Sequence, residues 1–213
     1  MFLQSILDGF SAMTSFGFWI LVVASAILSS FIEQPGGQSG GRMGILFLRP
    51  VCVSIGVAFL LPGLLPSAGL TAASIWSKHW LAISTAPVVT FVFLIIVTAI
   101  PGLGWLMTRQ ALQLFIEALI AFLFIARSSV TAMHAAADGA HYPGVLLTLG
   151  YAVMAIVVSY MAITAVGIPV VLFSGGNRSS QSRFNGLTSP VLNSTSGLLV
   201  FSMYVAYVRL LAH

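Results

Sequence analysis

Charged side chains are nearly absent from this chain. Only 6% of its 213 residues are Asp, Glu, Lys or Arg, whereas an ordinary soluble domain carries about 25%. Hydrophobic residues make up 59%. Such a composition excludes a soluble globular domain and predicts an integral membrane protein. The eight basic residues are spread along the chain and form no patch, which excludes nucleic acid as a partner.

Cysteine and the usual catalytic constellations are also missing. Cys52 is the only cysteine, so an internal disulfide and a CxxC-type metal site are both excluded. No apolar run carries two histidines for a haem, an acid pair for intramembrane proteolysis or a GxSxG elbow. We therefore expect neither enzyme activity nor a cofactor other than bound lipids.

One short segment has the spacing of metal ligands. In "HAAADGAH", His134, Asp138 and His141 follow one another at intervals of four and three residues. On a helix they would share one face and could bind a metal ion. Gly139 and Pro143 favour a loop instead, so these residues are a weak candidate and we expect no metal site.

Long apolar runs fill most of the sequence. They lie near residues 12–32, 43–66, 84–107, 111–134, 145–173 and 190–211. A helix needs roughly 20 apolar residues to cross a hydrocarbon core of about 30 Å. The fifth run, of about 29 residues, exceeds this length and should tilt or break at "GIP" (167–169). The prediction is an all-α, polytopic membrane bundle of about six spans, or five if this run does not cross, forming a single transmembrane domain over 1–213. Without alternating strands, a β-barrel is excluded.

Several side chains are typical of the membrane interface. "IWSKHW" puts two tryptophans four residues apart beside a lysine, which predicts a short interfacial helix over 71–80. The predicted interface anchors are Trp76, Trp80, Tyr204, Tyr207 and Arg209.

The distribution of arginine predicts the orientation. Connections one, three and five carry Arg42, Arg109, Arg178 and Arg183, so these connections are expected in the cytoplasm. Both termini would then lie on the non-cytoplasmic side of a bacterial-type inner membrane. Asp8 stands where a secretory signal would carry a basic residue, so we expect the first span to be retained.

"ILFLRPVCVSIG" (45–56) places an arginine inside an apolar run. Counted from the predicted starts of their spans, Arg49 and Glu117 both lie about 9 Å inside the membrane, from the same face. Unpaired, each charge would cost several kcal/mol, so we expect the two to form a pair. Such a pair could line a path for a proton, an ion or an anionic substrate, or it could simply fix helix packing. Separate roles, with Arg49 snorkelling and Glu117 binding a neighbouring subunit, are the remaining alternative.

Helix breaks are predicted at Pro50, Pro101, Gly167 and Pro169. "IVTAIPGLG" (96–104) and "AITAVGIPV" (162–170) both place Thr-Ala before a proline. Paired interruptions can mark a substrate site in transporters, although this match involves only a few common residues. Small residues such as Gly56 and "STSG" before Leu198 favour a tight bundle or an interface with another chain.

The last connection, "FSGGNRSSQSRFNG" (173–186), combines glycines and hydroxyls with Arg178 and Arg183. It could bind an anion such as a lipid phosphate, but we favour contact with a partner.

Two classes of function follow from these features. The favoured class is a non-catalytic subunit of a larger membrane assembly, which binds lipids and contacts other membrane subunits or copies of itself. The alternative is a small transporter or channel with Arg49 and Glu117 near its path.

Overall fold

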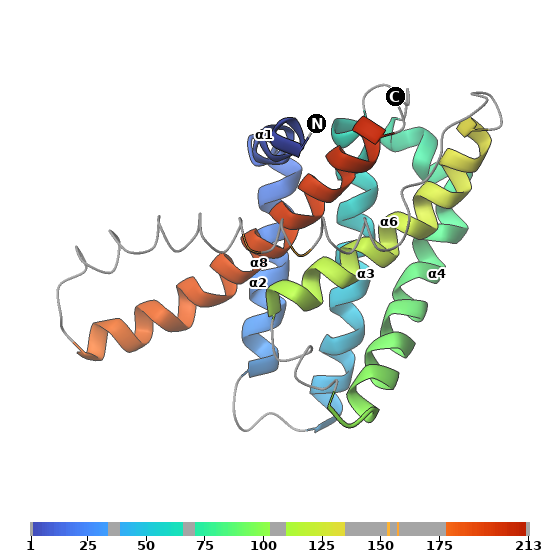
Figure 1. Ribbon diagram of the computed structural model, residues 1–213. Coiled ribbons are helices and arrows are strands. Elements are labelled where there is room, and N and C mark those ends of the chain that lie inside the picture. Colours follow the sequence, from blue (N-terminus) through green and yellow to red (C-terminus); the bar gives the residue numbers. More distant parts are fainter. Residues whose placement is uncertain are drawn as a thin grey trace.

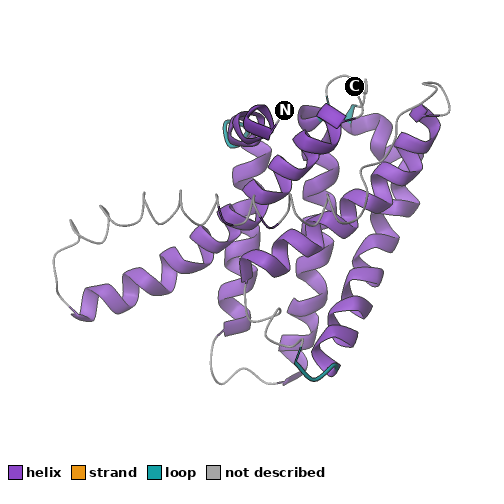
Figure 2. Cartoon of the chain, viewed as in Figure 1, coloured by secondary structure: helices purple, strands orange, loops and turns teal. Residues whose placement is uncertain are grey.

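The computed structural model describes residues 2–33, 39–65, 71–102, 110–134 and 178–211, together with positions 153 and 157. Within these residues the elements are all helices, as Figure 2 shows. They are α1 (Phe2–Ala12), α2 (Phe16–Glu33), α3 (Ser39–Leu64), α4 (Ala72–Ala99), α6 (Gln110–His134) and α8 (Arg178–Leu211). The predicted all-α class is confirmed for this part of the chain.

The helices pack as a closed ring. α2 contacts α3, α3 contacts α4, α4 contacts α6, α6 contacts α8, and α8 returns to α2, while α3 and α6 also meet across the ring. In Figure 1, α2, α3 and α4 stand side by side, α6 and α8 cross them obliquely, and α1 lies across one end of the bundle. α1 packs against α8, so both ends of the chain lie at that same end.

The described residues contain three helices that are long and apolar enough to cross a membrane: Leu46–Leu64, Ala73–Ala99 and Pro190–Leu210. A fourth crossing results if Leu3–Ala12 and Phe16–Phe31, bent by 76°, form one span. The apolar part of α6, Gln110–Ile125, is shorter. The structure thus fits a membrane protein with three to four such helices. The predicted span at 145–173 lies outside the described residues, apart from positions 153 and 157.

The first predicted span, 12–32, begins later than expected and is preceded by a separate helix. Residues 13–15 form a turn between α1 and α2. The hydroxyls of Ser11, Thr14 and Ser15 each donate to the carbonyl three residues earlier, at 2.7, 2.6 and 2.9 Å. Ser15 Oγ also accepts from Phe18 N at 3.3 Å, as an N-cap does. These local bonds compete with helical ones and separate the two helices.

The predicted short helix over 71–80 corresponds to the first part of α4, and its place at the membrane interface stays a prediction. Thr71 and Ser74 make a capping box at its start, and α4 is kinked at His79, whose backbone is not helical (φ −123°, ψ 19°). The predicted span 84–107 ends earlier than expected, because α4 ends at Ala99. Ile100 is extended because it precedes Pro101, and Gly102 has a φ of 89°, which turns the chain.

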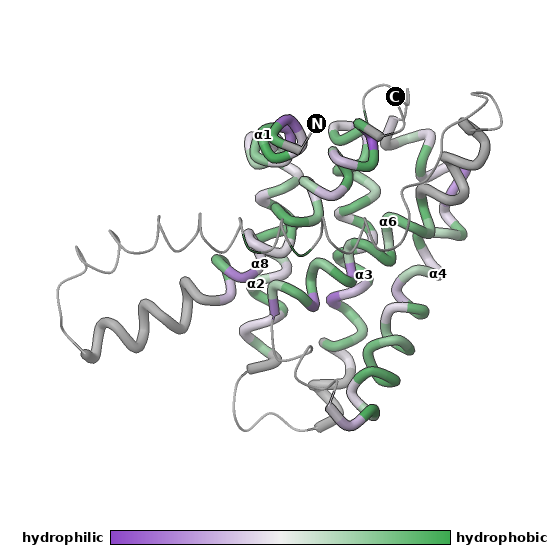
Figure 3. The backbone as a smooth tube through the Cα atoms, viewed as in Figure 1, coloured by the Kyte–Doolittle hydropathy of each residue, from purple (hydrophilic) through white to green (hydrophobic). Residues whose placement is uncertain are grey.

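Large apolar side chains lie on the outside as well as in the core. Ile20, Val23, Ile27 and Phe31 form an exposed stripe on α2, and α4 exposes Val88, Val92, Phe93, Ile95 and Ile96. Figure 3 shows hydrophobic residues over much of the described helices. A surface of this kind is unfavourable in water and suits contact with lipid.

Glycines allow helices to approach closely at two of the predicted small-residue positions. A Cβ built on Gly56 of α3 would lie 2.5 Å from a Leu21 methyl group on α2. A Cβ on Gly197 of α8 would lie 2.5 Å from the backbone oxygen of Ala111 on α6. Both contacts are typical of tightly packed membrane helices.

Candidate functional site

The structure brings Arg49 and Glu117 together where α3 crosses α6. Arg49 Nη2 lies 2.6 Å from Glu117 Oε1, and Arg49 Nε lies 3.0 Å from Glu117 Oε2. The guanidinium and the carboxylate therefore meet in a two-bond, planar arrangement, which is the strongest geometry for such a pair. The two side chains are only 3% and 0% exposed.

Neighbouring polar groups complete the site. Arg49 Nη1 donates to Ser29 Oγ on α2 at 3.2 Å. Gln113, one turn before Glu117 on α6, adds a side-chain hydrogen bond to the carboxylate. Each nitrogen of the guanidinium thus has an acceptor, and α2, α3 and α6 meet at this one side chain.

This arrangement can stabilise the packing of the three helices. A buried charge that loses its partner is strongly destabilising, so the pair holds α2, α3 and α6 in one register. Both side chains are enclosed by protein in this structure, and their polar atoms bond to each other and to Ser29 and Gln113.

The predicted helix breaks have different outcomes. α3 continues as a helix through Pro50, whereas Pro101 lies in the turn that follows α4. Gly167 and Pro169 lie outside the described residues.

A further proline site was missed in the sequence analysis. Pro87 lies inside α4 and cannot donate to the carbonyl of Ile83, four residues earlier. Ser54 Oγ of α3 donates to that oxygen instead, at 2.9 Å. A proline within a predicted span was the available signal, because it leaves the carbonyl four residues earlier without its usual N–H donor.

The predicted interface anchors divide into two groups. Trp76 and Trp80 are exposed, as anchors should be. Tyr204 and Tyr207 are only 7% and 9% exposed, so the prediction that they face the interface is wrong for this fold. They lie on the face of α8 that packs into the bundle, where the Tyr204 ring meets Phe115 and Phe122 edge-on at 6.3 Å.

Arg209 was also predicted to snorkel toward headgroups. Its Nη2 instead pairs with Asp8 Oδ2 on α1, although the two residues are 201 positions apart. The sequence contained a signal for this pair, because the predicted topology places both chain ends on one side of the membrane.

The remaining candidates are only partly described. Residues 178–189, which we expected to form a loop, are the start of α8. Arg178 and Arg183 therefore lie on a helix, and the backbone of this segment makes helical hydrogen bonds. His134 is the last residue of α6, and Asp138 and His141 lie outside the described residues. Within the described part of the chain, no group of three or more His, Cys, Asp or Glu side chains could hold a metal ion.

Comparison of the chain with protein-family models, with curated proteins and with solved structures finds no match.

Proposed function

We propose that the chain is a non-catalytic subunit of a larger membrane assembly, in which it acts as a helical scaffold of about six spans. The observation that carries this proposal is the enclosed Arg49–Glu117 pair, which is 3% and 0% exposed. A group that conducts protons or ions must meet water or substrate at some point on its path. A pair with its partners inside the protein is better suited to fixing the packing of helices.

The outer surfaces supply the contacts that a scaffold needs. The exposed apolar stripes of α2 and α4 suit lipid tails or the helices of another subunit. The N-terminal part of α8 projects away from α2 and α3 in Figure 1. This segment contains Arg178 and Arg183, and we propose that it contacts a partner subunit or anionic headgroups.

The proposed orientation places both termini on the non-cytoplasmic side of a bacterial-type inner membrane. Arg42, near the start of α3, belongs to the opposite end of the bundle from α1. An arginine at that end of the bundle supports placing that end in the cytoplasm.

The decisive experiment is to extract the protein from its own membrane in a mild detergent, measure its native mass and identify the co-purifying chains. The scaffold function predicts unrelated chains in fixed stoichiometry. A single species, or a homo-oligomer alone, would contradict it. Flux measurements in liposomes would then test the transporter alternative, which requires Arg49→Ala to abolish flux while folded protein still accumulates.

A further inference from the structure

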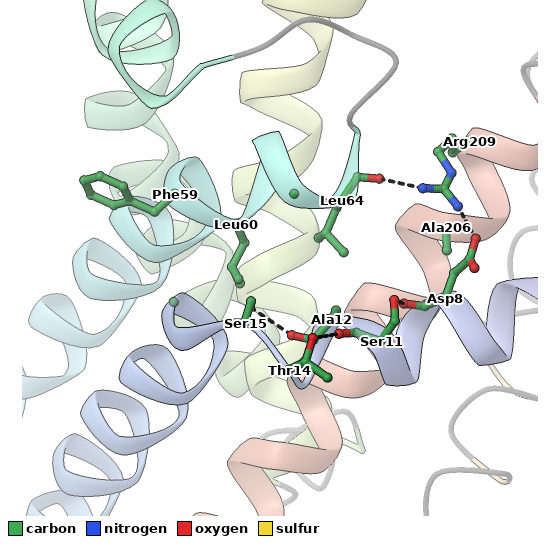
Figure 4. A pocket seen from close by; sticks show the side chains of 12 residues that line it. Asp8, Ser11, Ala12, Thr14, Ser15, Phe59, Leu60, Leu64, Ala206 and Arg209 are labelled. Carbon is green, nitrogen blue, oxygen red and sulfur yellow. Dashed lines mark hydrogen bonds and ion pairs between the residues drawn. The ribbon is translucent and has the colours of Figure 1, made fainter.

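A second polar site lies at the end of the bundle where α1 crosses it. A pocket of about 310 Å³ opens between α1, the turn at 13–15, α3 and the end of α8. Figure 4 shows Arg209 and Asp8 pointing toward each other at one side of this pocket, with Leu60 and Phe59 on the other. The volume equals that of roughly ten liquid waters and lies at the lower end of the range for ligand pockets.

The charges of this pocket are accessible, unlike those of the Arg49–Glu117 pair. The side chains of Arg209 and Asp8 are 22% and 23% exposed. Arg209 Nη1 also donates to the Leu64 carbonyl at 3.4 Å, and Gln4 Nε2 donates to Asp8 Oδ1 at 3.2 Å. A guanidinium has five N–H groups and a carboxylate about four lone-pair positions. Both groups therefore keep capacity for a further partner beyond these contacts.

Three hydroxyls on the pocket wall act as acceptors. Ser11, Thr14 and Ser15 each use their O–H proton in a bond to a backbone carbonyl. The oxygens of Ser11 and Thr14 keep their lone pairs for a ligand in the pocket, and Ser15 Oγ, which already accepts from Phe18 N, keeps one. The site thus combines an anion-binding guanidinium with a carboxylate and hydroxyl oxygens that accept N–H bonds. The complementary ligand is a zwitterion with a phosphate and a primary ammonium.

The position of α1 indicates where such a ligand would come from. α1 exposes Leu3, Leu7 and Phe10 along one side, and Gly9 lies against Met203 of α8 on another. An amphipathic helix that lies across the end of a membrane bundle is typical of the membrane interface. The pocket beside it is then at the depth of lipid headgroups, and exposed Phe59 continues its wall toward the lipid-facing surface.

We propose that this pocket binds a phosphoethanolamine group, with the phosphate on Arg209 and the ammonium on Asp8 and the hydroxyl oxygens. A phospholipid of the adjacent leaflet is the source that the apolar wall favours, and free phosphoethanolamine is the other source of the same chemistry. Phosphocholine fits less well because its ammonium has no N–H to donate. Phosphoglycerol fits less well because it offers Asp8 no cation.

The test is a titration of the delipidated full chain, followed by native mass spectrometry. The probes are phosphatidylethanolamine, phosphatidylcholine and phosphatidylglycerol with identical acyl chains, and soluble phosphoethanolamine. We expect phosphatidylethanolamine to bind about tenfold more tightly than the other two lipids, which corresponds to one charge-assisted bond. The soluble headgroup should bind more weakly than the lipid.

Two glycines of α3 provide a matched pair of variants. A Cβ added at Gly63, which lines the pocket, or at Gly44, which does not, meets nothing within 4 Å. Gly63→Leu should fill the pocket and lower phosphatidylethanolamine affinity at least about tenfold, whereas Gly44→Leu should leave it unchanged. Equal binding of the three lipids, or undiminished binding to Gly63→Leu, would overturn the proposal. Tighter binding of soluble phosphoethanolamine than of the lipid would overturn the lipid as the source.

Discussion

Arg49 and Glu117 show how two ionised side chains can be tolerated inside an apolar bundle. Each would be costly alone, yet together they form a neutral unit with two hydrogen bonds along the Nε–Nη2 edge of the guanidinium. Ser29 and Gln113 satisfy further positions of the pair. Removing one member of the pair should therefore destabilise the protein by more than the intact pair stabilises it.

Single replacements at this site should be far worse than a double one. Arg49→Met or Glu117→Met leaves an unpaired buried charge and should lower the free energy of unfolding by about 3–5 kcal/mol. The double variant removes both charges and should lie within about 1 kcal/mol of the wild type. Reversible unfolding in mixed micelles measures all four proteins. Additive losses in the double variant would show that the pair is not coupled.

Helix α4 illustrates the same requirement at the level of an element. Pro87 interrupts its hydrogen bonding, and Ser54 from α3 supplies the missing donor to Ile83 at 2.9 Å. In hydrocarbon, no water would replace that donor. The proline is therefore tolerated through a neighbouring helix, and the contact between α3 and α4 is polar at this one point.

Ser54→Ala should leave the Ile83 carbonyl without this donor and cost about 1–3 kcal/mol of unfolding free energy. In a Pro87→Ala background the same change should cost about 0.5 kcal/mol or less, because the new N–H of residue 87 can bond to Ile83. Ser30→Ala is the control, since this exposed hydroxyl donates only within its own helix, to Ile27. If Ser54→Ala costs the same in both backgrounds, the Ser54 hydroxyl does not replace the missing N–H of Pro87 at the Ile83 carbonyl.

The contact between α6 and α8 depends on the absence of a side chain at Gly197. A Cβ there would lie 2.5 Å from the Ala111 oxygen and 3.2 Å from Leu114 Cβ. Because backbone atoms cannot move independently, Gly197→Ala should push the helices apart and cost about 1–3 kcal/mol. Gly44→Ala has open space and should be neutral or stabilising by up to about 1 kcal/mol. Thermal unfolding of the two variants in one detergent compares them directly, and equal stabilities would contradict this packing.

At the scale of the whole molecule, the order of the helices determines which segments share one end of the bundle. α1, the start of α4 and the end of α8 lie at one end, and the start of α3 and the end of α4 lie at the other (Figure 1). The Asp8–Arg209 pair links the two ends of the described chain at the first of these surfaces.

Cysteine labelling tests this arrangement. In a Cys52→Ser background, Ser11→Cys and Ser77→Cys should react with an impermeant maleimide from the same side of the membrane, and Ile100→Cys from the opposite side. All three wild-type positions are exposed. Right-side-out and inverted vesicles distinguish the sides. Reaction of all three from one side would rule out α4 as a span.

Position along a helix could be predicted from the sequence, and position around it could not. The prediction of an Arg49–Glu117 contact needed only depth, which follows from a constant rise per residue. The exposure of Tyr204 and Tyr207 depended on rotation about the helix axis, and that prediction was wrong. Ser54 could not be assigned to Ile83, because the contact requires knowing which helices are neighbours.

The sequence by itself determined that the chain is helical and suited to a membrane, because its low charge and long apolar runs allow few other structures. Only the tertiary structure decided that α1 is a separate helix, that the helix starting at Ala72 continues through a kink at His79 to the end of α4, and that Asp8 pairs with Arg209. The physical reason is that lipid and protein interior are both apolar. Hydrophobicity therefore marks a span without showing which of its faces meets another helix.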